Sequence, residues 1–463
     1  MMQPPHYTGF ANDAGPGDWS FLGDGACAWF NAPSLAGSAL LAGRIAEVFQ
    51  GGTLPDIDLR SSGLRIHFDP GAPGRFSDEE AARARAISTA ARELGMASDP
   101  DTVQVMQLAI DASDSSSQGT FWQTVLGYEH DGAARLEDPT GRDPAISWAS
   151  PSAHNDLRGR IHVDVVRPPG QVEAVRSTLG QEPFGANGLT LADIDGNEVD
   201  LVPGGVLSPE PDTSDWSVAF GATASYPAAS GTVAVSLATA VAELADEAKI
   251  PLLVDLRPGR VTIDSGKDQW DDAERSDGSS FVALAGRIQA AARGLGLTAE
   301  RGRTRFVQFG VDAIDVDAVR GFWASVLGYA QDPRPSVTDI VDPRRLNPVL
   351  FFQQMDPVDE DRRRARNRLH IELQVSTETA RLKTEAVLEA GGTGPDGTER
   401  APAHLRRSRR QRAHPPHSAA GGMNGPGAGG SCSGGPSRRR GSSGSYGKHG
   451  ARWADCATAG GKR

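Results

Sequence analysis

Hydrophobic and polar positions follow two different spacings in the first hundred residues. Residues 40–49 place apolar side chains along one face of a helix, and residues 56–69 alternate like a β-hairpin that turns at 61–63. Ser77 and Glu80 form the sequence pattern of a capping box, which predicts a helix from there to about Leu94. This front module therefore reads as helix, hairpin, helix.

A second pattern follows, in which strands outnumber helices. A strand is predicted at 103–110, and a helix follows it, ending near Leu126 with Gly127 as its stop signal. Further strands are predicted at 145–149, 161–166 and 198–202, and a helix at 172–179. The order of these elements is a βαβββ pattern run twice.

Both modules occur again later in the chain. Phe121-Trp122-Gln123-Thr124-Val125-Leu126-Gly127-Tyr128 recurs as Phe322-Trp323-Ala324-Ser325-Val326-Leu327-Gly328-Tyr329, and residues 105–112 and 91–95 recur at the same offset of 201. Asp18-Trp19-Ser20 recurs at 215–217, at an offset of 197. The predicted fold class is α+β, a tandem duplication with front modules at 1–98 and 215–300, back modules at 103–204 and 304–403, and a tail at 404–463.

Composition excludes several classes of protein. The 463 residues contain no run of 18 apolar side chains, which argues against a membrane span, and the first residues lack the pattern of a secretory signal. Three scattered cysteines, Cys27, Cys432 and Cys456, cannot build a disulfide framework. We therefore expect a cytoplasmic protein.

The net charge of −12 is unevenly distributed. The tail from His404 to Arg463 holds 12 Lys and Arg and one acidic residue, so residues 1–403 carry a net charge of −23. An acidic body argues against nucleic acid as the main partner, because neutralising phosphates requires a basic surface. The expected partner is a small molecule.

The back module resembles the vicinal-oxygen-chelate superfamily, in its glyoxalase-like, bleomycin-resistance-like branch. The resemblance rests on the strand containing Gln107, on Phe121-Trp122 with Leu126-Gly127-Tyr128, on Ile161-His162-Val163-Asp164, and on residues 191–200. It covers nearly all of 103–204. The resemblance implies paired βαβββ units whose sheets curl into a cup.

The same resemblance implies metal ligands on the first strand of each unit and on a final strand. Carried over by position, the candidates are Gln107, His162 and Asp200 in copy one, with Gln308 and His370 as an incomplete set in copy two. Amide oxygen, imidazole and carboxylate together suit Zn, Fe, Ni or Mn. Glu198 is two residues from Asp200 and is a candidate general base or alternative ligand.

The front module resembles pterin carbinolamine dehydratase over residues 46–66 and the helix at 81–95. That family has a His-His-Pro run before the hairpin, but Thr53 and Leu54 precede Pro55 here, and Lys249 and Ile250 precede Pro251 in copy two. Proton transfer near neutral pH needs a group such as histidine, which these residues do not supply. The front modules are therefore interpreted as inactive relatives that serve as docking or dimerisation domains, or as a degenerate ligand site.

The tail has the composition of an unfolded segment. Reading from the second base of the His404 codon, synonymous codons permit Thr-Tyr-Ala-Asp-Pro-Glu-Gly-Asn-Glu-Leu, which matches Thr190–Val199 at six of ten positions. One hypothesis is that 404–463 is an out-of-frame product, and its rival is a genuine basic tail. If the tail is expressed as written, copy two lacks the last strand of its back module.

Three functions follow from these patterns. The first is binding or sequestration of a small molecule in the βαβββ cup, without a required metal. The second is metal-dependent lyase, isomerase or dioxygenase chemistry, in which the ion acts as a Lewis acid on neighbouring substrate oxygens. The third is residual dehydration of a carbinolamine pterin. The duplication also predicts a homo-oligomer or a pseudo-dimer within one chain.

Overall fold

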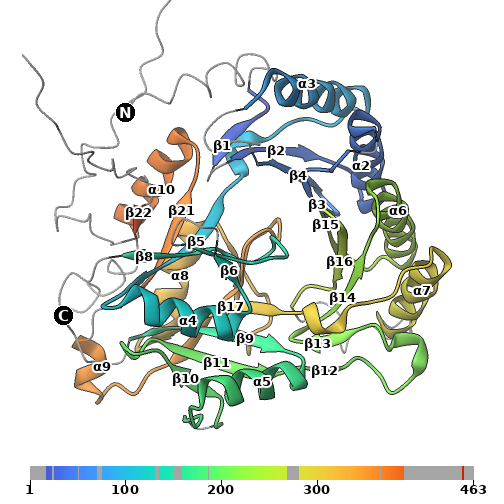
Figure 1. Ribbon diagram of the computed structural model, residues 1–463. Helices are drawn as coiled ribbons and strands as arrows, with labels where there is room; N and C mark the ends of the chain where they lie inside the picture. The colour runs from blue at the N-terminus through green and yellow to red at the C-terminus, as the bar shows by residue number, and fades with distance from the viewer. Residues whose placement is uncertain are drawn as a thin grey trace, which may run out of the picture.

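The two front modules share one nine-stranded antiparallel sheet, which runs from the top of Figure 1 down its right-hand side. At its centre, β3 (Asp56–Arg60) of the first module pairs with β15 (Leu253–Arg257) of the second. Outward from β3 lie β4 (Gly63–Phe68), β2 (Gly25–Asn31) and β1 (Ser20–Leu22), and outward from β15 lie β16 (Arg260–Asp264), β14 (Gly221–Pro227), β13 (Ser217–Ala219) and β12 (Gly205–Val206). This computed structural model describes residues 17–22, 25–50, 52–69, 76–130, 135–149, 159–185, 187–267, 281–364, 367–390 and 451–452.

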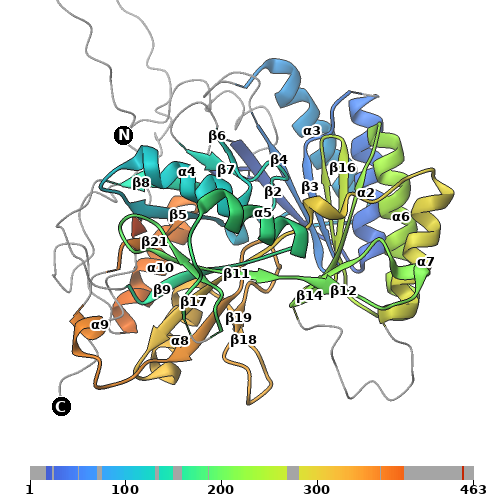
Figure 2. The same cartoon turned by 60° about the horizontal axis from the view of Figure 1, so that its bottom comes forward.

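Helices cover one face of this sheet, and the back modules lie against the other face (Figure 2). The helices are α2 (Leu35–Phe49), α3 (Asp78–Glu93), α6 (Gly231–Ala248) and α7 (Phe281–Gly294). The predicted capping box is confirmed, since Ser77 Oγ accepts from Glu80 N and Glu80 Oε2 accepts from Ser77 N. A single hydrophobic core runs through both front modules, so each module stabilises the other.

The back modules exchange halves between the two copies. One seven-stranded sheet joins the second half of copy one to the first half of copy two through the antiparallel pair of β9 (Ile161–Arg167) and β17 (Phe306–Ala313). Beside β9 lie β11 (Glu198–Pro203) and β10 (Thr190–Ala192), and beside β17 lie β20 (Leu350–Gln354), β19 (Ile340–Val341) and β18 (Ala330–Gln331).

The other sheet combines the remaining halves. It pairs β5 (Val105–Asp111) of copy one with β21 (Leu369–Gln374) of copy two, and continues from β5 through β8 (Ile146–Ala149), β7 (Leu136–Glu137) and β6 (Glu129–His130). The helices of these modules are α4 (Ser115–Leu126), α5 (Pro169–Leu179), α8 (Val316–Leu327), α9 (Glu360–Arg364) and α10 (Thr377–Glu389), with short 3₁₀ turns at η1 (Pro100–Thr102), η2 (Pro211–Thr213) and η3 (Arg301–Arg303).

The chain is therefore a pseudo-dimer of its two copies, not two independent units in series. The candidate ligands Gln107, His162 and Asp200 all belong to copy one, whereas the structure pairs each half of a back module with the opposite copy. The strands β5 and β17 share nearly the same residue pattern, so local sequence does not distinguish them as partners for β9. Burial of one apolar core common to both copies favours the exchanged arrangement.

The outer edge of β21 differs from the matching edge of β9. Five residues of β11 pair with β9, whereas within the described residues the outer edge of β21 pairs with the two-residue strand β22 (Ala451–Arg452). Apart from these two residues, the tail at 404–463 lies outside the described residues, so the frameshift hypothesis stays a prediction. Among the described helices, none combines the length and apolarity needed to cross a bilayer.

Cys27 is expected to resist thiol reagents as long as the chain is folded. It lies on β2 with its side chain fully buried, and burial raises the pKa of its thiol to about 12, although Arg65 partly opposes the shift. Because the thiolate is the reactive form, modification at pH 8 should be slow. Peptide mass spectrometry after labelling in native buffer and in denaturant measures this, and rapid modification of Cys27 in native buffer would contradict it.

Candidate metal centre

Three polar residues form a row across adjacent strands of the seven-stranded sheet. Asp200 on β11 is the register partner of Asp164 on β9, which in turn is the partner of Gln308 on β17. His162 precedes Asp164 by two residues, so both side chains project from the same face of β9. The exchange of halves therefore brings residues of both copies to one place.

His162, Asp164 and Asp200, here called the His162 group, offer ligand atoms that all lie within 4.8 Å of one another. His162 Nε2 is 3.5 Å from Asp164 Oδ1. Gln308 Nε2 donates to Asp164 Oδ2 at 2.9 Å, and Thr190 Oγ1 donates to Asp200 Oδ1 at 2.6 Å. Each carboxylate is thus held by one oxygen, which orients the other oxygen.

The position of the imidazole is set by its neighbours. Gly310 lies opposite His162 in the β9–β17 pair, and a Cβ on Gly310 would come within 2.2 Å of the ring atoms Cε1 and Nε2. Phe351 stands edge-on to the ring at 5.6 Å between centroids. Asp312 Oδ2 is 3.8 Å from His162 Nδ1 and is itself paired with Arg362. Ligand histidines commonly have such a carboxylate behind them.

The centre is short of positive charge. Burial raises the pKa of Asp164 to about 6; His162 and the hydrogen bond from Gln308 oppose this shift, and Asp200 adds to it. Two buried atoms, Asp164 Oδ1 and Gln308 Oε1, have no hydrogen-bond partner among the described residues. Buried polar atoms are normally satisfied. One imidazole, two carboxylates and an amide oxygen fit a divalent ion of the Zn, Fe, Ni or Mn kind.

The structure brings together only part of the predicted ligand set. His162 and Asp200 lie in one group, and the glutamine beside them is Gln308 of copy two. Gln107 lies on β5 in the other sheet, where its register partner is Glu372, because the halves are exchanged. Glu198 is buried on β11 but does not belong to the His162 group, so its role as a base stays a prediction.

A mirror group, comprising Gln107, His370, Glu372 and Asp111, occupies the equivalent place in the other sheet. His370 Nε2 is 3.3 Å from Asp111 Oδ1, as His162 lies near Asp312. Within the described part of the chain, however, the one cluster suited to a metal is the His162 group. The counterpart of Asp200 would belong to the strand beside β21, where β22 places Arg452 in register with Glu372.

Sequence reasoning gave no role to Asp164, although it lies in the quoted segment Ile161-His162-Val163-Asp164. Its spacing was the available signal, since residues two apart on a strand share a face. The same His-x-acid spacing recurs in His370 and Glu372. Gly310 was also missed, because the need for a glycine there arises from a strand pairing between copies.

The fold consists of half-sheets paired between the two copies, and the site is a group of one histidine and two carboxylates on one of these sheets. Two segments, 107–202 and 308–407, match the family model of a glyoxalase-like domain. These two matches are consistent with two copies of a domain of the vicinal-oxygen-chelate superfamily. No curated protein and no solved structure gives a significant match to the chain. The resemblance of the front modules to pterin dehydratase stays a prediction.

Proposed function

We propose that this protein binds a small molecule with two neighbouring oxygens at a single divalent metal ion held by the His162 group. The observation that carries the proposal is the pair of buried, unsatisfied oxygens, Asp164 Oδ1 and Gln308 Oε1, beside the histidine. Apolar sequestration without a metal would not require a buried carboxylate such as Asp164 at this place, since an unpaired carboxylate is costly to bury.

His162, Asp164, Asp200 and the amide oxygen of Gln308 would hold the ion, which supplies Lewis-acid stabilisation of negative charge on a bound ligand. The residues of the chain itself orient these donors. Thr190 fixes Asp200, Gln308 fixes Asp164, and Asp312 with Arg362 stands behind the imidazole. Turnover, whether lyase, isomerase or dioxygenase, would be an extension of this binding function.

The full chain, purified without chelator, is expected to contain about one divalent ion. His162→Ala should abolish binding, and Gln308→Ala should weaken it by roughly 10–100-fold, the usual cost of disturbing a metal site. Gln107→Ala should leave the ion in place, because Gln107 lies in the other sheet. Elemental mass spectrometry, before and after incubation with Zn, Ni, Mn and Fe, measures the stoichiometry.

The duplication provides the matched control. His370→Ala removes the equivalent histidine of the mirror group, so it tests for unspecific effects on folding. If His162→Ala and His370→Ala lose the same fraction of metal, the assignment to one centre is wrong. If the wild-type chain binds none of the four ions, the metal-dependent function is wrong, and ligand screening of the metal-free protein becomes the next step.

A further inference from the structure

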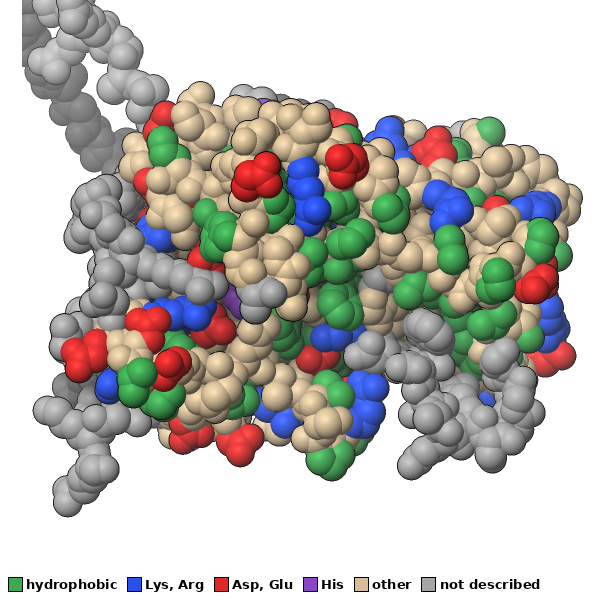
Figure 3. Space-filling view, turned by 90° about the horizontal axis from the view of Figure 1, so that it is seen from below, with side chains coloured by type: hydrophobic (Ala, Val, Ile, Leu, Met, Phe, Trp, Pro, Cys, Tyr) green, Lys and Arg blue, Asp and Glu red, His purple; other side chains and the backbone are tan. Residues whose placement is uncertain are grey.

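A cavity of about 230 Å³ lies where the second front module joins the back modules. Its wall includes Thr140, Arg167, Gln171, Arg303, Thr304 and Arg305, and no acidic residue lines it. Residues 302–303 end the 3₁₀ turn η3, and residues 304–305 connect it to strand β17. Charges of both signs are interspersed over the face shown in Figure 3, so a wall with three arginines and no acid is unusual for this acidic protein.

Arg167 is the least compensated of these cations. Its guanidinium donates to Thr124 O and Val125 O at 3.2 and 3.1 Å and to Gln171 Oε1 at 3.3 Å, and among the described residues no carboxylate pairs with it. Burial, together with the charge of Arg305, lowers the pKa of Arg167 to about 10. Its positive charge is therefore held at some cost, which an anion in the cavity would relieve.

The other two arginines differ in how far their charge is balanced. Arg305 pairs with Asp138 and, at 2.7 Å, with Asp143, so its charge is balanced by carboxylates. Arg303 is half-exposed, with 53% of its side chain accessible, and its Nε is 3.8 Å from Glu300. Arg303 is thus free to turn toward a ligand at the rim.

The duplication shows that the fold does not need these arginines. The mirror half is the equivalent region around strands β5 and β21. There, Gln104 stands at the position of Arg305, Thr102 at that of Arg303 and Val375 at that of Arg167. The last carbonyls of α8 accept there from Gln104 and Lys383, as those of α4 accept from Arg305 and Arg167.

At that mirror position, the corresponding side chains have local partners. Thr379, the counterpart of Gln171, donates to Asp101 O at 2.9 Å. Arg344, the counterpart of Thr140, is paired with Asp99 at 3.0 Å. In the mirror half, Gln104 and Lys383 make the helix-end contacts, and Arg344 is paired with a carboxylate. Arg167 differs from them, because among the described residues it has no carboxylate partner beside a cavity.

We infer that this cavity is a binding site for a small anion, with phosphate or carboxylate as the recognised group. Arginine guanidinium groups are well suited to both, since their donors match the geometry of two oxygens. The anion is either free or the terminal group of a larger metabolite. This site is separate from the metal centre and does not depend on the proposed function.

Calorimetric titration of the full chain tests the inference, at low ionic strength and with EDTA present so that metal-bound anions do not contribute. Inorganic phosphate, methyl phosphate and malonate are the probes, and at least one should bind saturably. Arg303→Gln should weaken binding by about 10-fold, the worth of one charged hydrogen bond, and Arg167→Gln by at least as much. Arg293→Gln is the control, since its side chain is also 53% exposed and lies on α7.

The relative affinities of the three probes distinguish the kinds of anion that the cavity binds. Methyl phosphate binding more tightly than inorganic phosphate assigns the site to the head group of a larger ligand, and equal or weaker binding assigns it to the free anion. Tightest binding of malonate selects carboxylate. Saturable binding of none of the probes overturns the inference, as does an unchanged affinity in Arg303→Gln, which lies on the rim and keeps the test independent of folding defects in Arg167→Gln.

Discussion

Replacing Asp58 by asparagine is expected to lower the free energy of unfolding by about 3–5 kcal/mol, the usual cost of breaking a buried ion pair. Only 2% of the Asp58 side chain is exposed, and it accepts from Arg257 Nη2 and from Arg65 Nε, both at 2.6 Å. Asparagine keeps the shape but removes the negative charge, so both guanidinium groups would lose a buried counter-charge.

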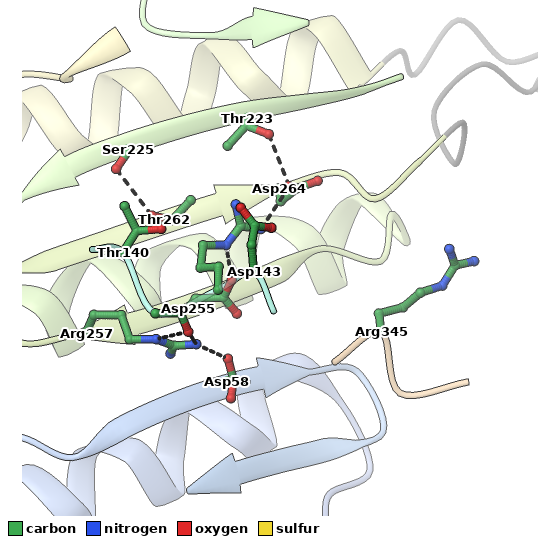
Figure 4. Close-up of polar contacts among 12 residues, drawn as sticks. Asp58, Thr140, Asp143, Thr223, Ser225, Asp255, Arg257, Thr262, Asp264 and Arg345 are labelled. Atoms are coloured by element: carbon green, nitrogen blue, oxygen red, sulfur yellow. Dashed lines mark hydrogen bonds and ion pairs between the residues drawn. The ribbon is translucent and has the colours of Figure 1, made fainter. Parts of the chain in front are cut away.

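Asp58 belongs to a symmetric quartet at the middle of the front sheet, formed by Asp58, Arg60, Asp255 and Arg257 (Figure 4 labels Asp58, Asp255 and Arg257). Asp58 faces Asp255 across the β3–β15 pair, and each arginine donates to the aspartate of the other module, Arg60 to Asp255 at 2.8 Å. Such reciprocal contacts are typical of a two-fold interface.

The same arginines fasten the back modules to the sheet. Arg257 donates to Gly141 O, and Arg60 donates to Arg345 O, at distances of 3.0–3.1 Å. Gly141 and Arg345 occupy equivalent loop positions, and both have a positive φ, 62° and 53°. Loss of the Asp58 charge should therefore weaken the docking of the back modules as well as the pairing of the front modules.

Acid titration gives a second readout of the same variant. Arg257 and Arg65 hold the pKa of Asp58 well below its usual value, despite the opposing effect of burial, and Arg60 and Arg142 lower that of Asp255. The unfolded chain therefore binds more protons than the folded chain below about pH 4. The stabilisation by Asp58 is present above this pH and is lost as the pH falls toward the pKa of Asp58 in the folded chain. The free energy of unfolding of Asp58→Asn should therefore fall less steeply with decreasing pH than that of the wild type.

Denaturant unfolding at pH 7 and at pH 3 measures both effects. Glu93→Gln is the control, because the Arg44–Glu93 pair is also short, at 2.9 Å, but both side chains are largely exposed. Exposed pairs contribute only about 0–1 kcal/mol. If Asp58→Asn costs no more than Glu93→Gln, the quartet does not stabilise the pseudo-dimer as described.

The helices and strands could be predicted from the sequence to a larger extent than the pairing of the strands between the two copies. Helix and strand periods depend on neighbouring residues, so the capping box at Ser77 and the hairpin at β3 and β4 were visible. Pairing between the copies depends on contacts about 140–270 residues apart in the chain. Gln107 and Gln308 lie in matching strands, and nothing local indicates which of them meets Asp164.

The quartet was hidden for a related reason. Asp58-Leu59-Arg60 and Asp255-Leu256-Arg257 look like strands with one face in solvent, since charged residues alternate with leucine. Only the antiparallel pairing of the two copies places each arginine beside the opposite aspartate and buries all four charges. A duplicated acid-x-base segment on a strand is therefore a signal for a self-complementary interface, but it becomes readable only with the pairing known.

Substituting alanine for Gly310 is expected to weaken metal binding by about 100-fold or more, which is at least the upper end of the cost of disturbing a metal site. The new Cβ would stand 2.2 Å from two ring atoms of His162 and 2.8 Å from Phe351 Cζ. The backbone cannot retreat, because Gly310 is paired on both sides, with β9 and with β20. The imidazole must therefore rotate away from Asp164 and Asp200.

The expected signature is loss of the metal with little loss of stability, and two variants make it specific. Gly321→Ala on α8 adds a Cβ that meets no atom within 4 Å, and alanine is favoured over glycine inside a helix, so metal binding should not change. The mirror strand has Ala109 opposite His370, so a Cβ already stands at the place that Gly310 leaves open. If Gly310→Ala binds metal as tightly as the wild type, the imidazole is not a ligand in the position described. If Ala109→Gly creates a second bound ion, the mirror group lacks only space; we expect no such gain, because the counterpart of Asp200 is not found in the described part of the chain.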